Sequence, residues 1–241
     1  MLTTIFNEVL YRPIFNALVF LYNIIPGHDF GIAIILFTLF IIIILSPFSY
    51  KLIKSRKQLS TLQPKIKEIQ KKFKDKQEQS RELMNLYKQH KVSPFSGCLP
   101  LLIQLPILFA LYRALINVLQ PENLSVLYSF IKNPGTINPL FLGVVDLSIA
   151  SPILAVLAAI SQFFYSKITM KYSTPTPPMG DQKGSLDIQK RMTKQMSFIG
   201  PIIILIFGLR FPAGLTLYWL VYALLTSARD YYFSRKFYGK N

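Results

Sequence analysis

The sequence predicts an all-α protein that crosses a membrane several times. Of its 241 residues, 51% are hydrophobic and 16% are charged, with 27 Lys and Arg against 11 Asp and Glu. Long apolar blocks alternate with short basic ones, a pattern typical of polytopic membrane proteins and not of basic soluble proteins that bind nucleic acid. A single cysteine, Cys98, excludes a disulfide framework within the chain.

Five apolar segments reach, or nearly reach, the roughly 20 residues that a membrane-spanning helix needs. They are residues 31–50, 98–119, 148–167, 195–209 and 213–233. The fourth is short and only a few residues separate it from the fifth, so these two are predicted to form a tight hairpin in the membrane.

The N-terminal region, residues 1–30, is interpreted differently. Its stretch 5–26 is apolar, but Glu8, Arg12 and Asn16 interrupt it. We expect an amphipathic helix that lies along the outer membrane interface, with a sixth span as the alternative. The first eleven residues contain no Lys or Arg, so no secretory signal peptide is expected, and the chain is expected to begin at its mature N-terminus.

The distribution of charge predicts the orientation. Residues 51–97 hold thirteen Lys and Arg against four acids, and residues 168–194 hold five against two. Residues 1–30 and 120–147 carry one cation each, Arg12 and Lys132. Under the positive-inside rule the two basic loops and the C-terminus are cytoplasmic and the N-terminus is outside. Five spans require termini on opposite sides, so the count of spans and the charges agree.

The large basic loop, residues 51–97, is predicted to form a helical hairpin in the cytoplasm. Pro64 suits the first turn of a helix, and apolar residues then recur at helical spacing on either side of a polar turn at 75–79. These apolar residues are Ile66, Ile69 and Phe73, then Leu83, Leu86 and Tyr87. Two roles are open for the lysines of this loop. They either only set the membrane topology or form a docking arm for anionic lipid or ribosomal RNA. The second loop, residues 168–194, is rich in Pro, Gly, Ser and Thr and is expected to be flexible; a basic tail ends the chain.

No catalytic, metal-binding or nucleotide motif is present, so an enzyme, a cofactor and a metal site are not expected. His28 and His90 fall on opposite sides of the membrane in this topology. The inner halves of three spans contain polar side chains, namely Gln104, Gln162, Ser161 and Thr226. Because unpaired amides facing lipid are costly, these groups are expected to face inward. They serve either as hydrogen bonds between helices or as the lining of a hydrated pocket open to the cytoplasm.

Three segments resemble the bacterial YidC-type membrane protein insertases of the Oxa superfamily. They are KVSPFSGCLPLLIQLPILFALYRAL at 91–115, FPAGLTLYWLVYALLTSARDYY at 211–232 and LQPKIKEIQKKFKD at 62–75. The resemblance implies a five-span core in its minimal form, with a hydrophilic groove open to the cytoplasm and to lipid but closed outside. By motif position it implies that Gln104, Gln162 and Trp219 line or border this groove, with Thr38 as a weaker candidate.

One position departs from the family pattern. Many relatives carry an arginine five residues before the proline of the first span, where this chain has Ile42 before Pro47. The groove is therefore expected to lack its usual cation, which puts in doubt any mechanism that attracts acidic substrate segments.

The function implied by the resemblance is a membrane protein insertase or chaperone of the bacterial cell membrane, with lateral release of its substrates into lipid. Its implied partners are nascent membrane proteins and lipids, with the Sec translocon and the ribosome as further candidates, and no DNA. A small transporter or lipid scramblase is the main alternative, and a structural partner of the translocon without insertion activity is another.

Overall fold

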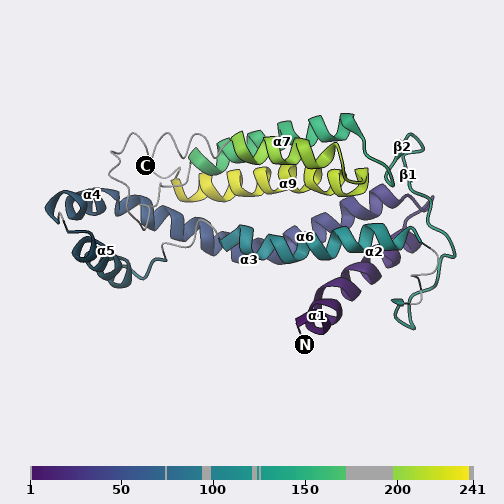
Figure 1. The fold of residues 1–241 in the computed structure, drawn as a ribbon, viewed down its shortest axis with the longest axis horizontal. Helices are drawn as coiled ribbons and strands as arrows, with labels where there is room; N and C mark the ends of the chain where they lie inside the picture. Colours follow the sequence, from purple (N-terminus) through teal and green to yellow (C-terminus); the bar gives the residue numbers. More distant parts are fainter. Residues whose placement is uncertain are drawn as a thin grey trace.

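The computed structural model describes residues 2–73, 75–93, 99–120, 124, 126–171 and 198–238. The molecule is an elongated bundle of helices with α4 and α5 at one end and a small β-hairpin, β1–β2, at the other (Figure 1). Helices make up nearly all of the regular structure, which confirms the predicted helical class. The hairpin, Leu140–Phe141 paired antiparallel with Val145–Asp146, was not predicted.

The N-terminal segment is helical from its first described residue. The helix α1 (Leu2–Phe6), a π-helical turn η1 (Asn7–Tyr11) and α2 (Arg12–Ile24) follow one another without a break. Phe15, Leu18 and Val19 are fully buried in the main apolar core. Asn16, which interrupts the apolar pattern in the sequence, is also buried, because its amide donates to the Val126 carbonyl and its oxygen accepts from the Tyr128 amide at 2.7 Å.

The helix α3 (Phe30–Thr61) is 32 residues long and contains Pro47. It begins where the Asp29 carboxylate accepts from the Ile32 amide at 3.0 Å, an N-cap that fits this residue type. At 1.5 Å per residue it is about 48 Å long, well beyond the roughly 30 Å of a bilayer core. The helix ends at Thr61, eleven residues past the predicted end of the first span at residue 50.

Among the described residues, two helices, α3 and the segment Pro152–Met170 of α7, are long and apolar enough to cross a membrane by length and composition. Leu102–Val118 and Phe198–Gly208 are shorter apolar helices. Leu102–Val118 belongs to α6 (Leu99–Val118) and Pro152–Met170 to α7 (Pro152–Lys171), and the last long helix is α9 (Ala213–Tyr238). Most of the predicted flexible loop, from residue 172 onward, lies outside the described residues.

The basic loop contains α4 (Gln63–Lys72) and α5 (Lys76–Gln89). Leu62 and Ile66 at the start of α4 pack with Leu86 and Tyr87 near the end of α5 in a small apolar cluster, so the two helices run antiparallel. The predicted turn at 75–79 is wrong in its position. Asp75 caps α5 by accepting from the Glu78 amide at 3.0 Å, which makes the residues after it helical.

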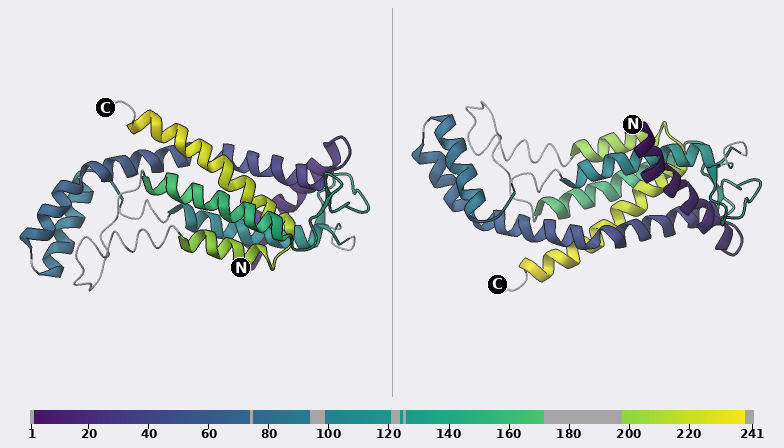
Figure 2. Two further views of the ribbon diagram at one scale, coloured as in Figure 1. Left: turned by 90° about the horizontal axis from the view of Figure 1, so that it is seen from above. Right: turned by 90° about the horizontal axis from the view of Figure 1, so that it is seen from below.

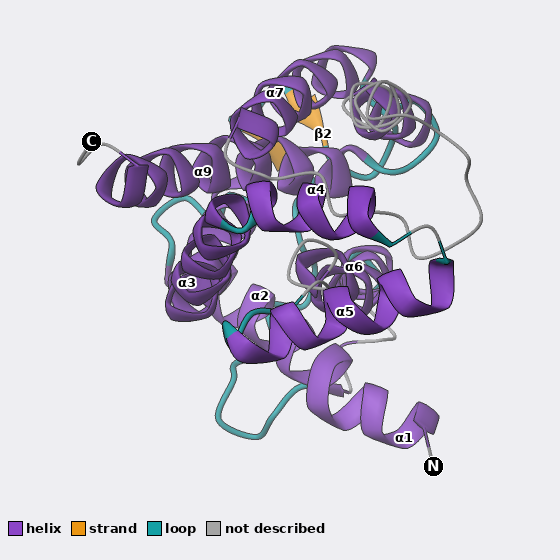
Figure 3. Ribbon diagram, turned by 90° about the vertical axis from the view of Figure 1, so that its left-hand side faces the viewer, coloured by secondary structure: helices purple, strands orange, loops and turns teal. Residues whose placement is uncertain are grey.

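The long helices pack side by side. In two perpendicular views α7 lies along α9, and α9 crosses α3 (Figures 1 and 2). The C-terminal end of α9 points toward the same end of the bundle as α4 and α5 (Figure 2). Seen from that end, α4 and α5 lie in front of α3, α6, α7 and α9 (Figure 3). The core between these helices includes Tyr218, Phe37 and Leu111, all fully or almost fully buried.

Candidate functional site

A polar pocket lies between α3, α6, α7 and α9, in the half of the bundle nearer α4 and α5. Its cavity volume is about 30 Å³. Roughly 10–15 Å³ of such space is enough for one water molecule. The lining residues are Leu45, Phe48, Ser49, Leu52, Ile53, Arg56, Ile103, Gln104, Tyr165, Tyr222, Arg229 and Asp230. The pocket can therefore hold water beside charged and hydroxyl groups.

One face of α3 forms a wall of this pocket. The six α3 residues in the lining follow the helical pattern i, i+3, i+4, i+7, i+8 and i+11, which places them on the same side of a helix. This face continues without interruption from Leu45 to Arg56, across the predicted boundary between the first span and the cytoplasmic loop. Arg56, assigned by its sequence to a solvated basic loop, thus lies in the pocket.

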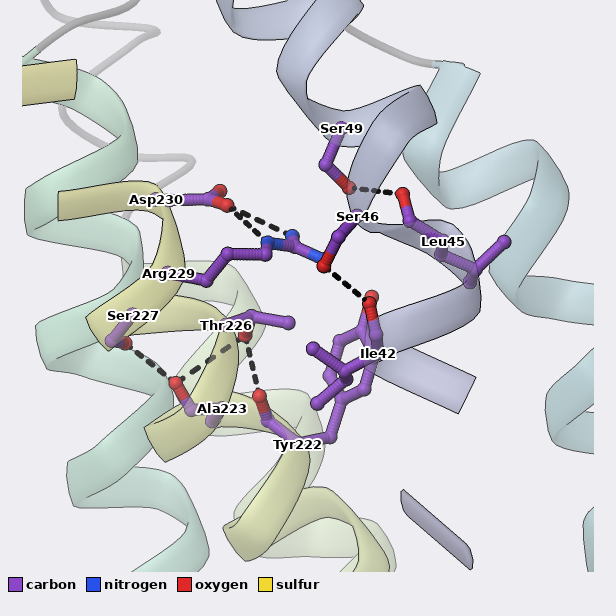
Figure 4. Close-up of polar contacts among 10 residues, drawn as sticks. All are labelled: Ile42, Leu45, Ser46, Ser49, Tyr222, Ala223, Thr226, Ser227, Arg229 and Asp230. Atoms are coloured by element: carbon purple, nitrogen blue, oxygen red, sulfur yellow. Dashed lines mark hydrogen bonds and ion pairs between the residues drawn. The ribbon is translucent and has the colours of Figure 1, made fainter. Parts of the chain in front are cut away.

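The opposite wall carries an ion pair on α9. The Nη2 atom of Arg229 lies 2.8 Å from Oδ1 of Asp230, and Nε of Arg229 donates to the same oxygen at 2.9 Å. Both side chains are largely buried. Arg229 extends from α9 toward α3 (Figure 4). Because the two residues are adjacent, the pair holds the guanidinium in place without linking α9 to another helix.

Arg56 gives the pocket a second guanidinium. Among the residues that the structure describes, its buried Nε has no hydrogen-bond partner. Arg56 and Asp230 also line a smaller adjoining pocket with Thr169, whose buried hydroxyl has no partner within the described part of the chain. Two guanidinium groups face one carboxylate, and a buried donor is unpaired. This arrangement favours a visiting anion, since unpaired buried donors and uncompensated charges are costly.

Gln104 is the predicted site residue that lines the pocket. Its Nε2 donates to the hydroxyl of Tyr218 at 2.5 Å, which joins α6 to the fully buried face of α9. The two interpretations left open by the sequence, a hydrogen bond between helices and a pocket wall, therefore both apply to this side chain.

Gln162 and Trp219 lie elsewhere. Gln162 on α7 faces the helix Phe198–Gly208, with its Nε2 3.5 Å from where a Cβ on Gly200 would be. Trp219 is on α9, and its ring lies 6.4 Å from the ring of Phe207, which belongs to the short helix Phe198–Gly208. Neither residue is in the lining of the pocket. Their role in a groove stays a prediction.

The predicted hydroxyl residues bond within their own helices. Thr38 donates to the Ile34 carbonyl at 2.7 Å, Ser161 donates to Leu157 at 2.8 Å, and Thr226 donates to Tyr222. All three side chains are buried and none lines the pocket. Such local bonds satisfy a hydroxyl without any contact to a second helix.

Ile42, at the position of the usual family arginine, is also buried and outside the lining. Figure 4 shows it on α3 about one turn before Ser46, whose hydroxyl donates to the Ile42 carbonyl at 2.7 Å. The pocket nevertheless contains cations, because Arg56 and Arg229 supply them from positions nearer to α4 and α5. The expectation that the groove lacks its usual cation at the position of Ile42 stays a prediction.

Sequence reasoning missed all the charged and tyrosine residues of the pocket, namely Arg56, Tyr165, Tyr222, Arg229 and Asp230. One usable signal was present. The apolar residues of α3 keep their helical spacing beyond residue 50 through Leu52, Ile53 and Leu59, all buried. That spacing places Arg56 on the inward face of the same helix. No comparable local signal relates Arg56 to Asp230, which is far away in the chain.

The role of the Gln104–Tyr218 hydrogen bond can be tested with a double-mutant cycle. Gln104→Leu leaves the buried Tyr218 hydroxyl unpaired, so we expect a loss of roughly 1–3 kcal/mol in the free energy of unfolding. Tyr218→Phe in the same chain removes the orphaned group, so the double variant is expected to recover most of that loss. Thermal unfolding in detergent measures the four stabilities. Strictly additive losses would contradict the direct bond.

Comparison with known proteins identifies the family. The family model of the 60Kd inner membrane protein matches residues 20–240. The membrane protein insertase YidC of Syntrophus aciditrophicus is 34% identical over 230 residues, which are 94% of this chain and 36% of that protein. The YidC of Geotalea daltonii is 32% identical over 231 residues, 95% of this chain and 38% of that protein.

A crystal structure of an active YidC insertase, with its first transmembrane domain resolved, has the same fold. It superposes with a TM-score of 0.57 at 28% sequence identity, over 92% of this chain and 46% of that one. This chain thus spans less than half the length of the relatives it matches. The resemblance drawn from the three motifs is confirmed, and the chain belongs to the 60Kd inner membrane protein family, together with the YidC insertases to which it aligns.

Proposed function

We propose that this protein is a membrane protein insertase that accepts polar segments of nascent membrane proteins from the cytoplasmic side. The observation that carries this proposal is the pocket. It is polar and large enough for water, and it lies between helices whose outer surfaces expose many large apolar side chains, such as Phe40, Ile43 and Phe109. A water-accessible recess inside an apolar exterior is what a polar segment needs in order to enter a bilayer part of the way.

The proposed membrane arrangement has five spans, formed by α3, α6, α7, the helix Phe198–Gly208 and α9. The N-terminal helices lie along the outer surface, and α4 and α5 lie in the cytoplasm. The concentration of Lys and Arg in residues 51–97 supports this orientation. The C-terminal end of α9, with Arg235 and Lys236, lies at the same end of the bundle as α4 and α5, as the orientation requires.

The pocket is closed toward the other end. Beyond Gln104 and Tyr218 the space between the helices is filled by buried side chains, including Phe37, Ile34 and Leu111. A pocket that is open at one end lets water and a polar segment enter from the cytoplasm without creating a continuous channel.

The energetic problem for such a protein is the charge on the incoming segment. A charged side chain at the bilayer centre costs at least about 2.5–3.5 kcal/mol. Water and polar groups at the depth of the pocket shorten the apolar distance that remains to be crossed. The apolar part of the substrate then moves sideways into lipid, driven by the burial of its hydrophobic surface.

Arg56 and Arg229 supply the positive charge for this mechanism, since Ile42 stands where many relatives carry an arginine. With one carboxylate between them, they leave the pocket with an excess of positive charge for acidic flanks of a substrate. Nascent membrane proteins and lipids are the proposed partners. The Sec translocon and the ribosome are further proposed contacts, the latter through the basic surface of α4 and α5.

Rescue of an insertase-depleted bacterium tests the proposal. Expression of this chain is expected to restore growth and the membrane integration of substrates with polar translocated tails. The alternative function, a small transporter or lipid scramblase, predicts no rescue, together with solute or lipid flux in proteoliposomes that contain no nascent chain. Failure to rescue at normal levels of membrane-integrated protein would overturn the insertase assignment.

A further inference from the structure

The β1–β2 hairpin ends in an apolar tip that nothing in the described part of the chain covers. Leu142 is 66% exposed and Val144 is 82% exposed, with Gly143 between them. The hairpin lies at the end of the bundle opposite to α4 and α5 (Figure 1). Isolated exposed apolar residues need no explanation, but two at the tip of a tight turn form a small projecting surface.

The backbone of this turn makes the choice of leucine unusual. The Val144 amide donates to the Phe141 carbonyl at 3.0 Å, and the two central residues have φ of +53° at Leu142 and +70° at Gly143. Turns with positive φ at both central positions strongly prefer Asn-Gly or Asp-Gly. A bulky side chain in this conformation is strained. Neither backbone conformation nor hydration favours leucine at this position, so its benefit must come from contact with an apolar environment.

The tip is held rigidly by the start of α3. The Leu142 amide donates to Oδ2 of Asp29 at 2.7 Å, while Oδ1 of the same carboxylate caps α3 at Ile32. The Phe141 side chain packs directly on Gly31, where a Cβ atom would lie 2.8 Å from the Cβ of Phe141. The strained turn is thus positioned by Asp29 and Gly31, at the N-terminus of a helix long and apolar enough to span a membrane.

The apolar surface continues from the tip to α7. Ile149, which connects the hairpin to α7, and Ile153 in the first turn of α7 are both strongly exposed. Phe130, also strongly exposed, stacks on Tyr128 in the preceding loop, with 5.5 Å between the ring centroids. From residue 138 to residue 153 the only charged residue is Asp146, whose carboxylate is occupied by the amide and hydroxyl of Ser148.

We propose that Leu142 and Val144 insert into the outer leaflet of the membrane and anchor the outer ends of α3 and α7. The occupant of this surface is lipid, because the large exposed side chains from Leu140 to Ile153 are aliphatic, and Ile153 begins a candidate spanning helix whose next exposed side chains, Val156 and Ile160 among them, are also apolar. The inference rests on the membrane orientation given in the proposed function, but it does not depend on insertion activity.

Fluorescence quenching in proteoliposomes tests this inference. Val144→Cys in a Cys98→Ser chain is labelled with a bimane and reconstituted into phosphatidylethanolamine and phosphatidylglycerol with brominated acyl chains. Thr136→Cys, exposed in the same outer loop, is the matched control. Insertion of about 5–10 Å below the headgroups is expected to give blue-shifted emission and at least about twofold stronger quenching at position 144 than at position 136. Labelling of Thr136→Cys by an impermeant maleimide from outside reports the side of the membrane.

A second variant distinguishes insertion of the tip into lipid from an effect on the stability of the fold. Leu142→Asn relieves the backbone strain, so the melting temperature in detergent is expected to stay the same or rise, while quenching at position 144 falls. Equal quenching at positions 144 and 136 would overturn the inference. So would a blue shift that appears in native membranes but not in pure lipid, since that result assigns the tip to a protein partner. Insertion of a reporter protein, measured in the same vesicles, shows independently whether the proposed function holds.

Discussion

Arg56→Gln combined with Arg229→Gln is expected to lower the insertion of substrates with acidic translocated segments by about tenfold, which corresponds to roughly 1.4 kcal/mol. The physical reason is the loss of both guanidinium groups from a pocket that contains one carboxylate. A hydrogen bond to a charged group is worth about 1.5–3 kcal/mol, so the expected loss is close to that of one weak bond of this kind. Protease protection of reporters graded by tail charge measures the effect.

The outcome is diagnostic only if the loss depends on substrate charge. Substrates with neutral tails are expected to insert almost as well as with the unmodified chain. Arg235→Gln is the matched control, because Arg235 lies on the same helix as Arg229 but is exposed. If acidic and neutral tails lose insertion equally in the double variant, the arginines act through stability of the protein, and their proposed role is wrong.

Gly31→Ala is expected to destabilise the folded protein by about 3 kcal/mol, at the upper end of the usual cost of overpacking. The new methyl group would meet the side chain of Phe141, including its Cβ at 2.8 Å. Rotation of the aromatic ring about χ1 does not move that Cβ. The helix start and the β-hairpin must therefore separate, which also weakens the bond between Leu142 and Asp29. A lower melting temperature in detergent is the expected observation.

Gly214→Ala supplies the control for this prediction. A Cβ on Gly214 would meet its nearest neighbour, the flexible end of Ile34, at 3.4 Å, which is ordinary contact, so a stability close to that of the unmodified chain is expected. Adding Phe141→Ala to Gly31→Ala should restore part of the lost stability. Equal melting temperatures for Gly31→Ala and Gly214→Ala would show that the hairpin does not pack as described.

The predictions made from single segments agree well with the structure. Apolar run lengths identify α3, α6, α7 and α9, and helical spacing identifies α4 and α5. The two errors concern the positions of a turn and of a helix end. The turn at 75–79 is misplaced because Asp75 is an N-cap and not a turn residue. The end of the first span does not coincide with the end of a helix, because polarity changes along α3 while its hydrogen bonding continues to Thr61.

The candidate site was predicted less completely. Gln104 was found because an amide within a long apolar run must have a partner, and that partner is Tyr218. Gln162 lies in a different place, opposite Gly200 and outside the lining of the pocket. Depth along a span is readable from the sequence, whereas the direction in which a side chain points depends on the rotation of its helix. That rotation is set by packing against the other helices.

Segment by segment, the amino-acid sequence determined the helical membrane class, the order of the helices and the location of the basic loop in the chain, because hydrophobicity and charge act locally along the chain. Only the tertiary structure decided that Arg56, Arg229 and Asp230 share one pocket, that Gln104 bonds to Tyr218, and that Phe141 rests on Gly31. Apart from the adjacent Arg229 and Asp230, these residues come together from positions more than a hundred apart in the chain. They arise from how the helices turn their faces toward one another, which no single segment specifies.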